Sequence, residues 1–228
     1  MKIIFEIYYH TRWGESLFLS GDIDELGANE DNRAVMMDYQ GDGLWKYTME
    51  LPASAKKFHY EYLVKSGEGI RREWGSPHSF SPGRNAGEYR LVDRWRDVPA
   101  DLPFYSSAFI QGIFFRQHAD SVVETIEPGT LTVKVDASQL RPDERLVMVG
   151  DCPELGDWDV LKAPLLNDSS FPEWQITLDG RQLKFPFEYK FVIVRTHQRE
   201  VVAWETGENR ICREKPQNPS EAVVVSGL

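Results

Sequence analysis

The stretches GDIDELGAN (residues 21–29) and GDCPELGDW (residues 150–158) both begin with Gly-Asp and reach Leu-Gly five residues later, at an offset of 129 residues (150 − 21 = 129). The same offset joins Ala34 to Ala163 and Trp45 to Trp174 without a gap. Chance rarely keeps register over so long a stretch, and self-similarity at a fixed spacing indicates a repeated structural unit. We therefore expect two copies of one fold, each the size of a small domain.

The repeat is less regular beyond this region. Residues 58–62 (FHYEY) resemble residues 185–189 (FPFEY) at an offset of 127, and Trp74 resembles Trp204 at an offset of 130. We predict that small changes in loop length cause this drift.

Short alternating segments fill each copy. Apolar residues recur at every second position in residues 5–9, 17–19, 45–49 and 58–64, with turn-forming residues between these segments. A period of two is typical of half-buried β-strands, whereas sustained helical periodicity is absent. The sequence therefore predicts an all-β protein made of two tandem antiparallel immunoglobulin-like β-sandwich modules.

We expect module 1 to span residues 1–95 and module 2 to span residues 129–228. The intervening residues 96–128 contain the apolar run AFIQGIFF (residues 108–115). A flexible linker would be more polar, so we predict an ordered linker whose apolar run pairs as a strand or packs between the modules and fixes their arrangement. The alternative is that this run merely begins module 2.

The charge balance limits the partners. The 228 residues carry 36 acidic and 26 basic side chains, and the net charge of −10 repels phosphate backbones and anionic membranes. We expect neither nucleic acid nor membrane as a partner. Charge interrupts the amino terminus too early for a secretory signal, so we expect a cytoplasmic protein. Cys152 and Cys212 are then expected as free thiols, with one disulfide as the alternative.

Three motifs of the second copy combine aromatic and polar side chains. Phe187, Tyr189 and Phe191 share one strand face, which leaves Lys190 on the face away from the core. The segment WETGENR (residues 204–210) ends in turn-forming residues, which suits an exposed aromatic beside polar groups. An indole plane can hold the apolar face of a sugar ring while polar side chains bond its hydroxyls. The predicted sugar-binding residues are Trp158, Lys190, Trp204, Glu205 and Asn209.

The motifs LGDW (residues 155–158), EYKF (residues 188–191) and WETGENR resemble those of the starch-binding domains of carbohydrate-binding module family twenty. The resemblance implies non-catalytic binding of α-1,4-glucans, such as starch, glycogen and malto-oligosaccharides. It also implies that Trp158 and Trp204 form one glucan site. Lys190 and Asn209 would then bond sugar hydroxyls, with Glu205 beside them. The alternative is that both tryptophans are packing residues, because most Trp side chains are largely buried.

Module 1 departs from the family at this site. On the alignment above, Asn29 replaces Trp158 and Leu63 replaces Lys190, and Trp74 is the one aromatic platform that remains.

The family also has a second glucan site, formed by an aromatic before a Gly-Glu turn and by aromatics near a mid-domain Trp. In module 1 the resemblance places this site at Trp13 and Tyr39. Trp45 and Trp174 recur on strands of both copies, so we expect them to support the cores. Module 1 would thus bind glucan through Trp13 and Tyr39, or serve mainly as a spacer.

No catalytic motif accompanies these residues. The five His residues lack metal-ligand spacing, and the chain has no glycine-rich phosphate loop and no nucleophile elbow. No pair of carboxylates is set apart for glycoside chemistry, and a glucan-processing barrel needs about 250 residues. We expect no catalytic residue, no metal and no cofactor.

Two such modules at the start of a chain resemble the amino-terminal region of amylomaltase-type 4-α-glucanotransferases, also called disproportionating enzymes. The resemblance implies an α-glucan partner and a C-terminal catalytic domain in a longer parent chain. Two other hypotheses remain: a glycogen-targeting module of a regulatory phosphatase or kinase, and a β-sandwich that binds protein. A protein-binding surface would expose apolar patches in place of the Trp, Lys and Asn cluster.

Overall fold

The computed structural model describes residues 1–83, 87–97, 126–137, 139–196 and 198–226. In these ranges the regular structure consists of β-strands and short 3-10 helices, so the prediction of an all-β protein made of β-sandwiches is confirmed. None of the described helices is long and apolar enough to cross a lipid bilayer.

Module 1 is a sandwich of two sheets. The first sheet contains β1 (Lys2–Tyr8), β4 (Asp38–Gly41), β5 (Leu44–Glu50) and β9 (Glu88–Arg94). The second contains β2 (Ser16–Gly21), β3 (Val35–Met36), β6 (Phe58–Ser66), β7 (Gly69–Arg72) and β8 (His78–Phe80). Two 3-10 helices, η1 (Asp24–Leu26) and η2 (Asp31–Arg33), follow β2. The alternation in β1 buries Ile3, Phe5 and Ile7 in the core between the sheets, called core 1 here.

Module 2 repeats this plan. Its first sheet contains β10 (Thr130–Asp136), β12 (Asn167–Ser170), β13 (Glu173–Asp179) and β17 (Glu221–Val225). Its second contains β11 (Glu144–Gly150), β14 (Phe187–Arg195), β15 (Val201–Trp204) and β16 (Arg210–Cys212), and η4 (Pro153–Leu155) follows β11. As the period of two predicts, Phe187, Tyr189 and Phe191 point into the core of this module, called core 2 here.

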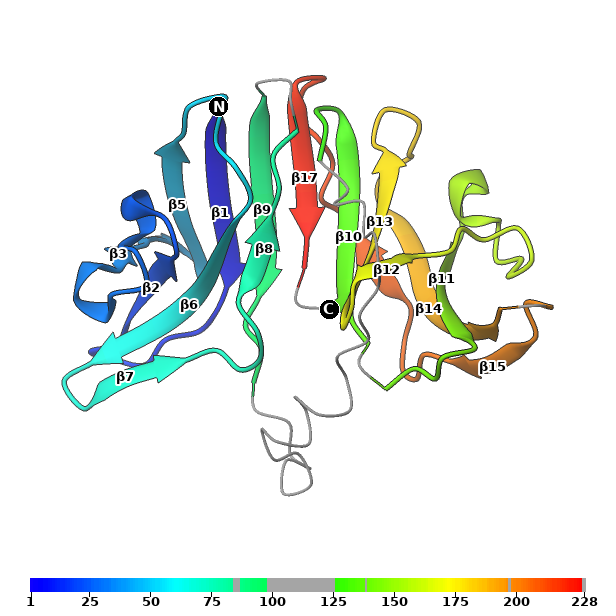
Figure 1. Ribbon diagram of the computed structural model, residues 1–228, viewed down its shortest axis with the longest axis horizontal. Coiled ribbons are helices and arrows are strands. Elements are labelled where there is room, and N and C mark those ends of the chain that lie inside the picture. Colours follow the sequence, from blue (N-terminus) through cyan, green and yellow to red (C-terminus); the bar gives the residue numbers. More distant parts are fainter. Residues whose placement is uncertain (84–86, 98–125, 138, 197, 227–228) are drawn as a thin grey trace.

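The first sheets of the two modules join into one sheet of eight strands, in the order β12-β13-β10-β17-β9-β1-β5-β4 (Figure 1). The join is a parallel pairing of the last strands of the modules, with Glu88 of β9 opposite Glu221 of β17. The pairings of β1 with β9 and of β10 with β17 are also parallel, so the sheet is mixed and not purely antiparallel. A fixed arrangement was expected from residues 108–115, but these lie outside the described residues, and β9 and β17 provide the join instead.

Strand β17 contributes side chains to both cores. Successive residues of a strand point to opposite faces of the sheet. Ala222 and Val224 accordingly belong to core 1, whereas Val223 and Val225 belong to core 2. Val92 of β9 lies in core 2 in the same way. The two cores therefore lie on opposite faces of the shared sheet, and each contains side chains from the last strand of the other module.

Buried polar side chains reinforce the join. The carboxylate of Asp93, at the end of β9, accepts hydrogen bonds from the hydroxyl groups of Tyr60 (2.9 Å) and Tyr62 (2.6 Å). It also accepts one from the hydroxyl of Ser226, which follows β17. Burial, and then the charge of Asp93, raise the pKa of both tyrosines well above the ordinary value, so both phenols stay protonated as donors.

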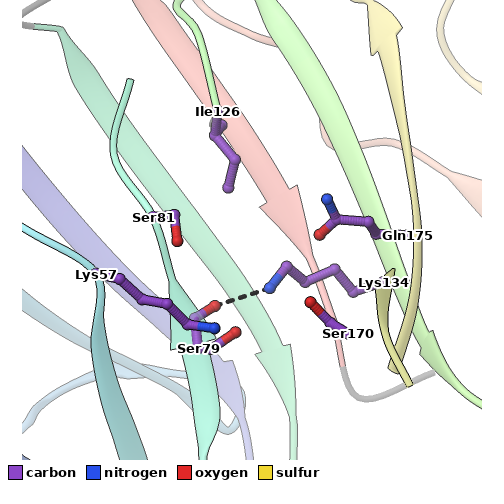
Figure 2. Close-up of a pocket in the computed structure, with 7 residues that line it drawn as sticks. All are labelled: Lys57, Ser79, Ser81, Ile126, Lys134, Ser170 and Gln175. Atoms are coloured by element: carbon purple, nitrogen blue, oxygen red, sulfur yellow. Dashed lines mark hydrogen bonds between the residues drawn. The ribbon is translucent and has the colours of Figure 1, made fainter. Parts of the chain in front are cut away.

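A small pocket lies between β8 of module 1 and strands β10 and β13 of module 2 (Figure 2). Lys134 extends from β10 across this pocket and donates to the carbonyl oxygen of Ser79 at 2.7 Å. Its ammonium also donates to the carboxylate of Glu173 at 2.9 Å, which balances the buried charge. We read the pocket as part of the contact between the modules.

Candidate functional site

The predicted site residues of module 2 surround the outer face of the sheet formed by β11, β14 and β15. Since Tyr189 and Phe191 point into core 2, Lys190 and Val192 point outward. In the antiparallel pairing of β14 with β15, Trp204 is the partner of Val192. Paired residues share a face, so Trp204 lies on the outer face, where 44% of its surface is exposed.

Trp158 reaches the same face from the loop after β11. Its side chain is half-buried and packs against a small apolar cluster, called the outer cluster here. The members of this cluster are Val147, Val149, Val160, Ala163, Val192 and Val194. Because Val192 is also the strand partner of Trp204, both indoles border one apolar patch.

The backbone at Trp158 is unusual for a large side chain. Its φ angle is +65°, in the left-handed region, and its N–H donates to the carbonyl oxygen of Gly150 at 2.7 Å. Module 1 has Asn29 at the equivalent place, with a φ of +63° and the same bond to Gly21 at 2.7 Å. Asn tolerates this conformation, whereas other L-residues lose about 1–2 kcal/mol. The indole is present against the preference of the backbone, which suggests a role for the side chain itself.

Lys190 holds the segment that follows Trp204. Its ammonium donates to the carbonyl oxygens of Glu205 (3.2 Å), Gly207 (2.6 Å) and Glu208 (3.2 Å). These three bonds match the three hydrogens of an ammonium group, so the lysine fixes this loop beside the indole of Trp204.

Asn209 lies at the rim of the same face. It is exposed, and its amide nitrogen donates to the carboxylate of Glu188 at 2.7 Å. A second amide hydrogen and the amide oxygen are chemically available beyond this bond.

The carboxylate of Glu205 has internal partners. It accepts from the N–H of Phe191 at 3.2 Å and from the guanidinium of Arg210 at 2.7 Å. Module 1 has the same arrangement, because Glu73 accepts from the N–H of Tyr62 at 3.1 Å. A carboxylate present in both modules supports the framework, and Glu205 joins the candidate site through its carbonyl bond to Lys190.

The strand pairings give the true equivalence of the modules. Gly21 is opposite Tyr60 in the pairing of β2 with β6, and Gly150 is opposite Tyr189 in the pairing of β11 with β14. Both positions differ by 129 residues, so the first offset continues and the predicted offset of 127 is wrong by two residues. A shift of two residues leaves every side chain on its own face, so alternation cannot reveal it.

Two substitutions in module 1 must therefore be reassigned. Glu61, and not Leu63, occupies the place of Lys190. Leu63 occupies the place of Val192, and its partner on β7 is Arg72.

Arg72 consequently takes the place of Trp204, and the predicted equivalence of Trp74 is also wrong. Trp74 lies after the end of β7, where it is half-buried and its N–H donates to the carbonyl oxygen of Arg96 at 2.9 Å.

Ion pairs close the equivalent face of module 1. The guanidinium of Arg72 pairs with the carboxylates of Asp31 and Glu61. The ammonium of Lys65 lies 4.1 Å from the centre of the Phe18 ring. Charged side chains thus cover the place where module 2 presents two indoles.

The second predicted site of module 1 is open to solvent. The Trp13 side chain is fully exposed, and Tyr39 is 57% exposed. The Tyr39 ring contacts the Trp45 ring, with 5.1 Å between centroids. Trp45 and Trp174 are buried, and each indole N–H donates to a backbone carbonyl, so the prediction that both support the cores is confirmed.

Cys152 and Cys212 are free and buried, as expected. Burial raises the pKa of Cys152 to about 11 and that of Cys212 to about 12, so both thiols are protonated at neutral pH. Within the described ranges, no group of three or more His, Cys, Asp or Glu side chains could hold a metal ion.

A sequence profile of the family described as starch binding domain matches residues 1–85 and 130–223. The 4-alpha-glucanotransferase DPE2 of Oryza sativa subsp. japonica is 26% identical over 230 residues, covering 92% of this chain and 24% of that protein. The AA13 family lytic polysaccharide monooxygenase A of Aspergillus terreus is 32% identical over 73 residues, covering 30% of this chain and 18% of that protein. The chain therefore spans less than a quarter of the length of either relative.

Among solved structures, the family 20 module of the maltotetraose-forming amylase from Pseudomonas saccharophila is 20% identical, with a TM-score of 0.35. The match covers 41% of this chain and 98% of that one.

Proposed function

The chain belongs to the family of starch-binding domains, and on that premise we propose that module 2 binds α-1,4-glucan at its outer face, through Trp158 and Trp204. The observation that carries this proposal is that both indoles border one apolar patch around Val192. Sugar rings present apolar C–H faces that stack on indole planes.

The polar residues divide into two roles in this proposal. Asn209 bonds sugar hydroxyls directly, because it is exposed at the rim and keeps amide groups beyond its bond to Glu188. Lys190 acts mainly by holding the loop beside Trp204, since its three donors already have carbonyl partners. Glu205 supports the same loop from the interior.

Module 1 contributes through Trp13 and Tyr39 in this proposal. Both side chains are exposed, and the contact with Trp45 supports the Tyr39 ring. Its face equivalent to the Trp158 and Trp204 site does not bind glucan, because the ion pairs of Arg72 occupy it.

We further propose that the chain is the non-catalytic glucan-binding region of a longer cytoplasmic 4-α-glucanotransferase. The similarity to the rice glucanotransferase, which extends over 92% of this chain, supports this proposal. In that setting the modules would bring starch, glycogen or malto-oligosaccharides to a separate catalytic domain, and two linked sites would raise the avidity for long chains.

The test is a titration with maltoheptaose, followed by Trp fluorescence and by retention on insoluble starch. We expect Trp158→Ala and Trp204→Ala each to weaken binding at least tenfold. Trp74→Ala is the matched control, since Trp74 lies away from the proposed site and its loss should leave the affinity unchanged. If the wild type gives no saturable signal and is not retained on starch, the proposal fails and a protein-binding role gains support.

A further inference from the structure

One side chain joins the two segments of module 2 that carry the exposed tryptophans. Arg199 lies in the turn between β14 and β15. Its guanidinium donates to the carbonyl oxygens of Leu161 and Ala163, both at 2.8 Å, with a longer contact to Val160 at 3.4 Å. All three acceptors belong to the loop that begins at Trp158.

The same turn leads directly into the other tryptophan. Strand β15 starts at Val201 and ends at Trp204. The guanidinium of Arg199 therefore connects the loop of Trp158 with the hairpin of Trp204. We infer that Arg199 is a positioning residue of the glucan site, which sets the relative placement of the two indoles; this inference rests on the function proposed above.

The backbone of Arg199 supports this role. Its φ angle is +50°, in the left-handed region that arginine rarely adopts, and its N–H donates to the carbonyl oxygen of Arg195 at 3.0 Å. The turn thus keeps an unfavourable conformation that turns the guanidinium toward the loop. A guanidinium suits several carbonyl acceptors, because it presents its donors in a rigid plane.

Module 1 holds the equivalent loop in a different way. The offset of 129 residues makes Asp31 the equivalent of Val160, and the carbonyl oxygen of Asp31 accepts a hydrogen bond from Lys65. Lys65 stands on the outer face of β6, where module 2 has Val194. In module 2 the cation has moved from the face to the turn, as Arg199.

This move leaves the outer face of module 2 apolar. Val194 joins the outer cluster against which Trp158 packs, whereas a lysine there would place a charge beneath the indole. Arg199 bonds the carbonyls of Val160 and Ala163, the two loop residues of the same cluster. The guanidinium and the cluster therefore hold one loop from two directions.

The test compares Arg199→Met with Arg195→Met, a matched control in the same hairpin whose side chain pairs only with Glu200 at 3.5 Å. We expect Arg199→Met to weaken maltoheptaose binding about five- to tenfold, and Arg195→Met to change it less than twofold. Arg199→Lys should lie between the wild type and Arg199→Met, because an ammonium reaches fewer carbonyls at once.

A double-mutant cycle separates positioning from general damage. If Arg199 acts through the loop of Trp158, adding Arg199→Met to Trp158→Asn should weaken binding less than twofold further. A full five- to tenfold loss in that background would overturn the inference, as would wild-type affinity in Arg199→Met. Should Arg199→Met fail to fold, Arg199→Lys carries the same cycle.

These outcomes are distinguishable from a failure of the proposed function. If Trp158→Ala and Trp204→Ala bind as the wild type does, the glucan site itself is misplaced. If both lose binding and Arg199→Met does not, the site stands and the positioning role is wrong.

Discussion

The outer faces of the two modules have the same backbone and opposite surfaces. Asn29 and Trp158 share a left-handed conformation and the same hydrogen bond to a strand glycine. Around this shared backbone, module 1 places ion pairs centred on Arg72, and module 2 places the indole of Trp204 over an apolar patch. The fold is retained in both copies while the surface changes completely, so function must be argued from the surface and not from the fold.

Both surfaces also depend on one folded unit, because β17 contributes to core 1 and core 2. Val224→Asp places a carboxylate in core 1, and we expect the free energy of unfolding to fall by about 4 kcal/mol or more. The two modules should unfold together, as seen by urea denaturation followed by fluorescence. Val202→Asp, at a site 42% exposed, is the control that should cost little. Loss of structure in module 1 alone would show that the modules are independent.

The modules also differ in the buried groups that make them sensitive to alkali. The folded-state pKa of Cys212 is raised from 9.0 to about 12, so the stabilisation is complete below pH 9 and is lost as the pH rises toward 12. Cys212→Ala should remove about 1.4 kcal/mol per pH unit from the slope of stability between pH 9 and 11. Urea unfolding at pH 8, 9, 10 and 11 measures this slope, and equal slopes for both proteins would contradict the assignment.

Exchanging the residues at the left-handed position gives a smaller effect. Asn29→Trp should lower the free energy of unfolding by about 1 kcal/mol, because the indole gains no apolar cluster to offset the backbone cost. Trp158→Asn relieves the backbone and loses packing, so its stability should stay within about 1 kcal/mol of the wild type. Urea denaturation of both variants checks this asymmetry, which is absent if Asn29→Trp proves as stable as the wild type.

Much of the fold followed from simple patterns. The repeat predicted two modules, and alternation predicted the core residues of β1 and β14. The shared sheet was not predicted, although β17 carried a signal for it. The continuous apolar run Ala222–Val225 is typical of a strand buried on both faces, which a last strand at a free edge would not be.

The candidate site was predicted less completely. The motifs indicated Trp158, Lys190 and Trp204, and the structure brings all three to one face. The alignment of module 1 slipped by two residues, which preserves alternation and can be corrected only from strand pairing. Arg199 was missed because its role depends on a turn conformation and on backbone acceptors, neither of which leaves a pattern in the side chains.

The most direct test of the proposed site gives module 2 the surface of module 1. The variant Trp158→Asn/Trp204→Arg, made in a Trp13→Ala background to remove the second proposed site, is titrated with maltoheptaose by calorimetry. We predict no saturable binding, together with an unfolding free energy close to that of Trp13→Ala alone. Binding that persists at the affinity of Trp13→Ala would contradict the assignment of the site to Trp158 and Trp204.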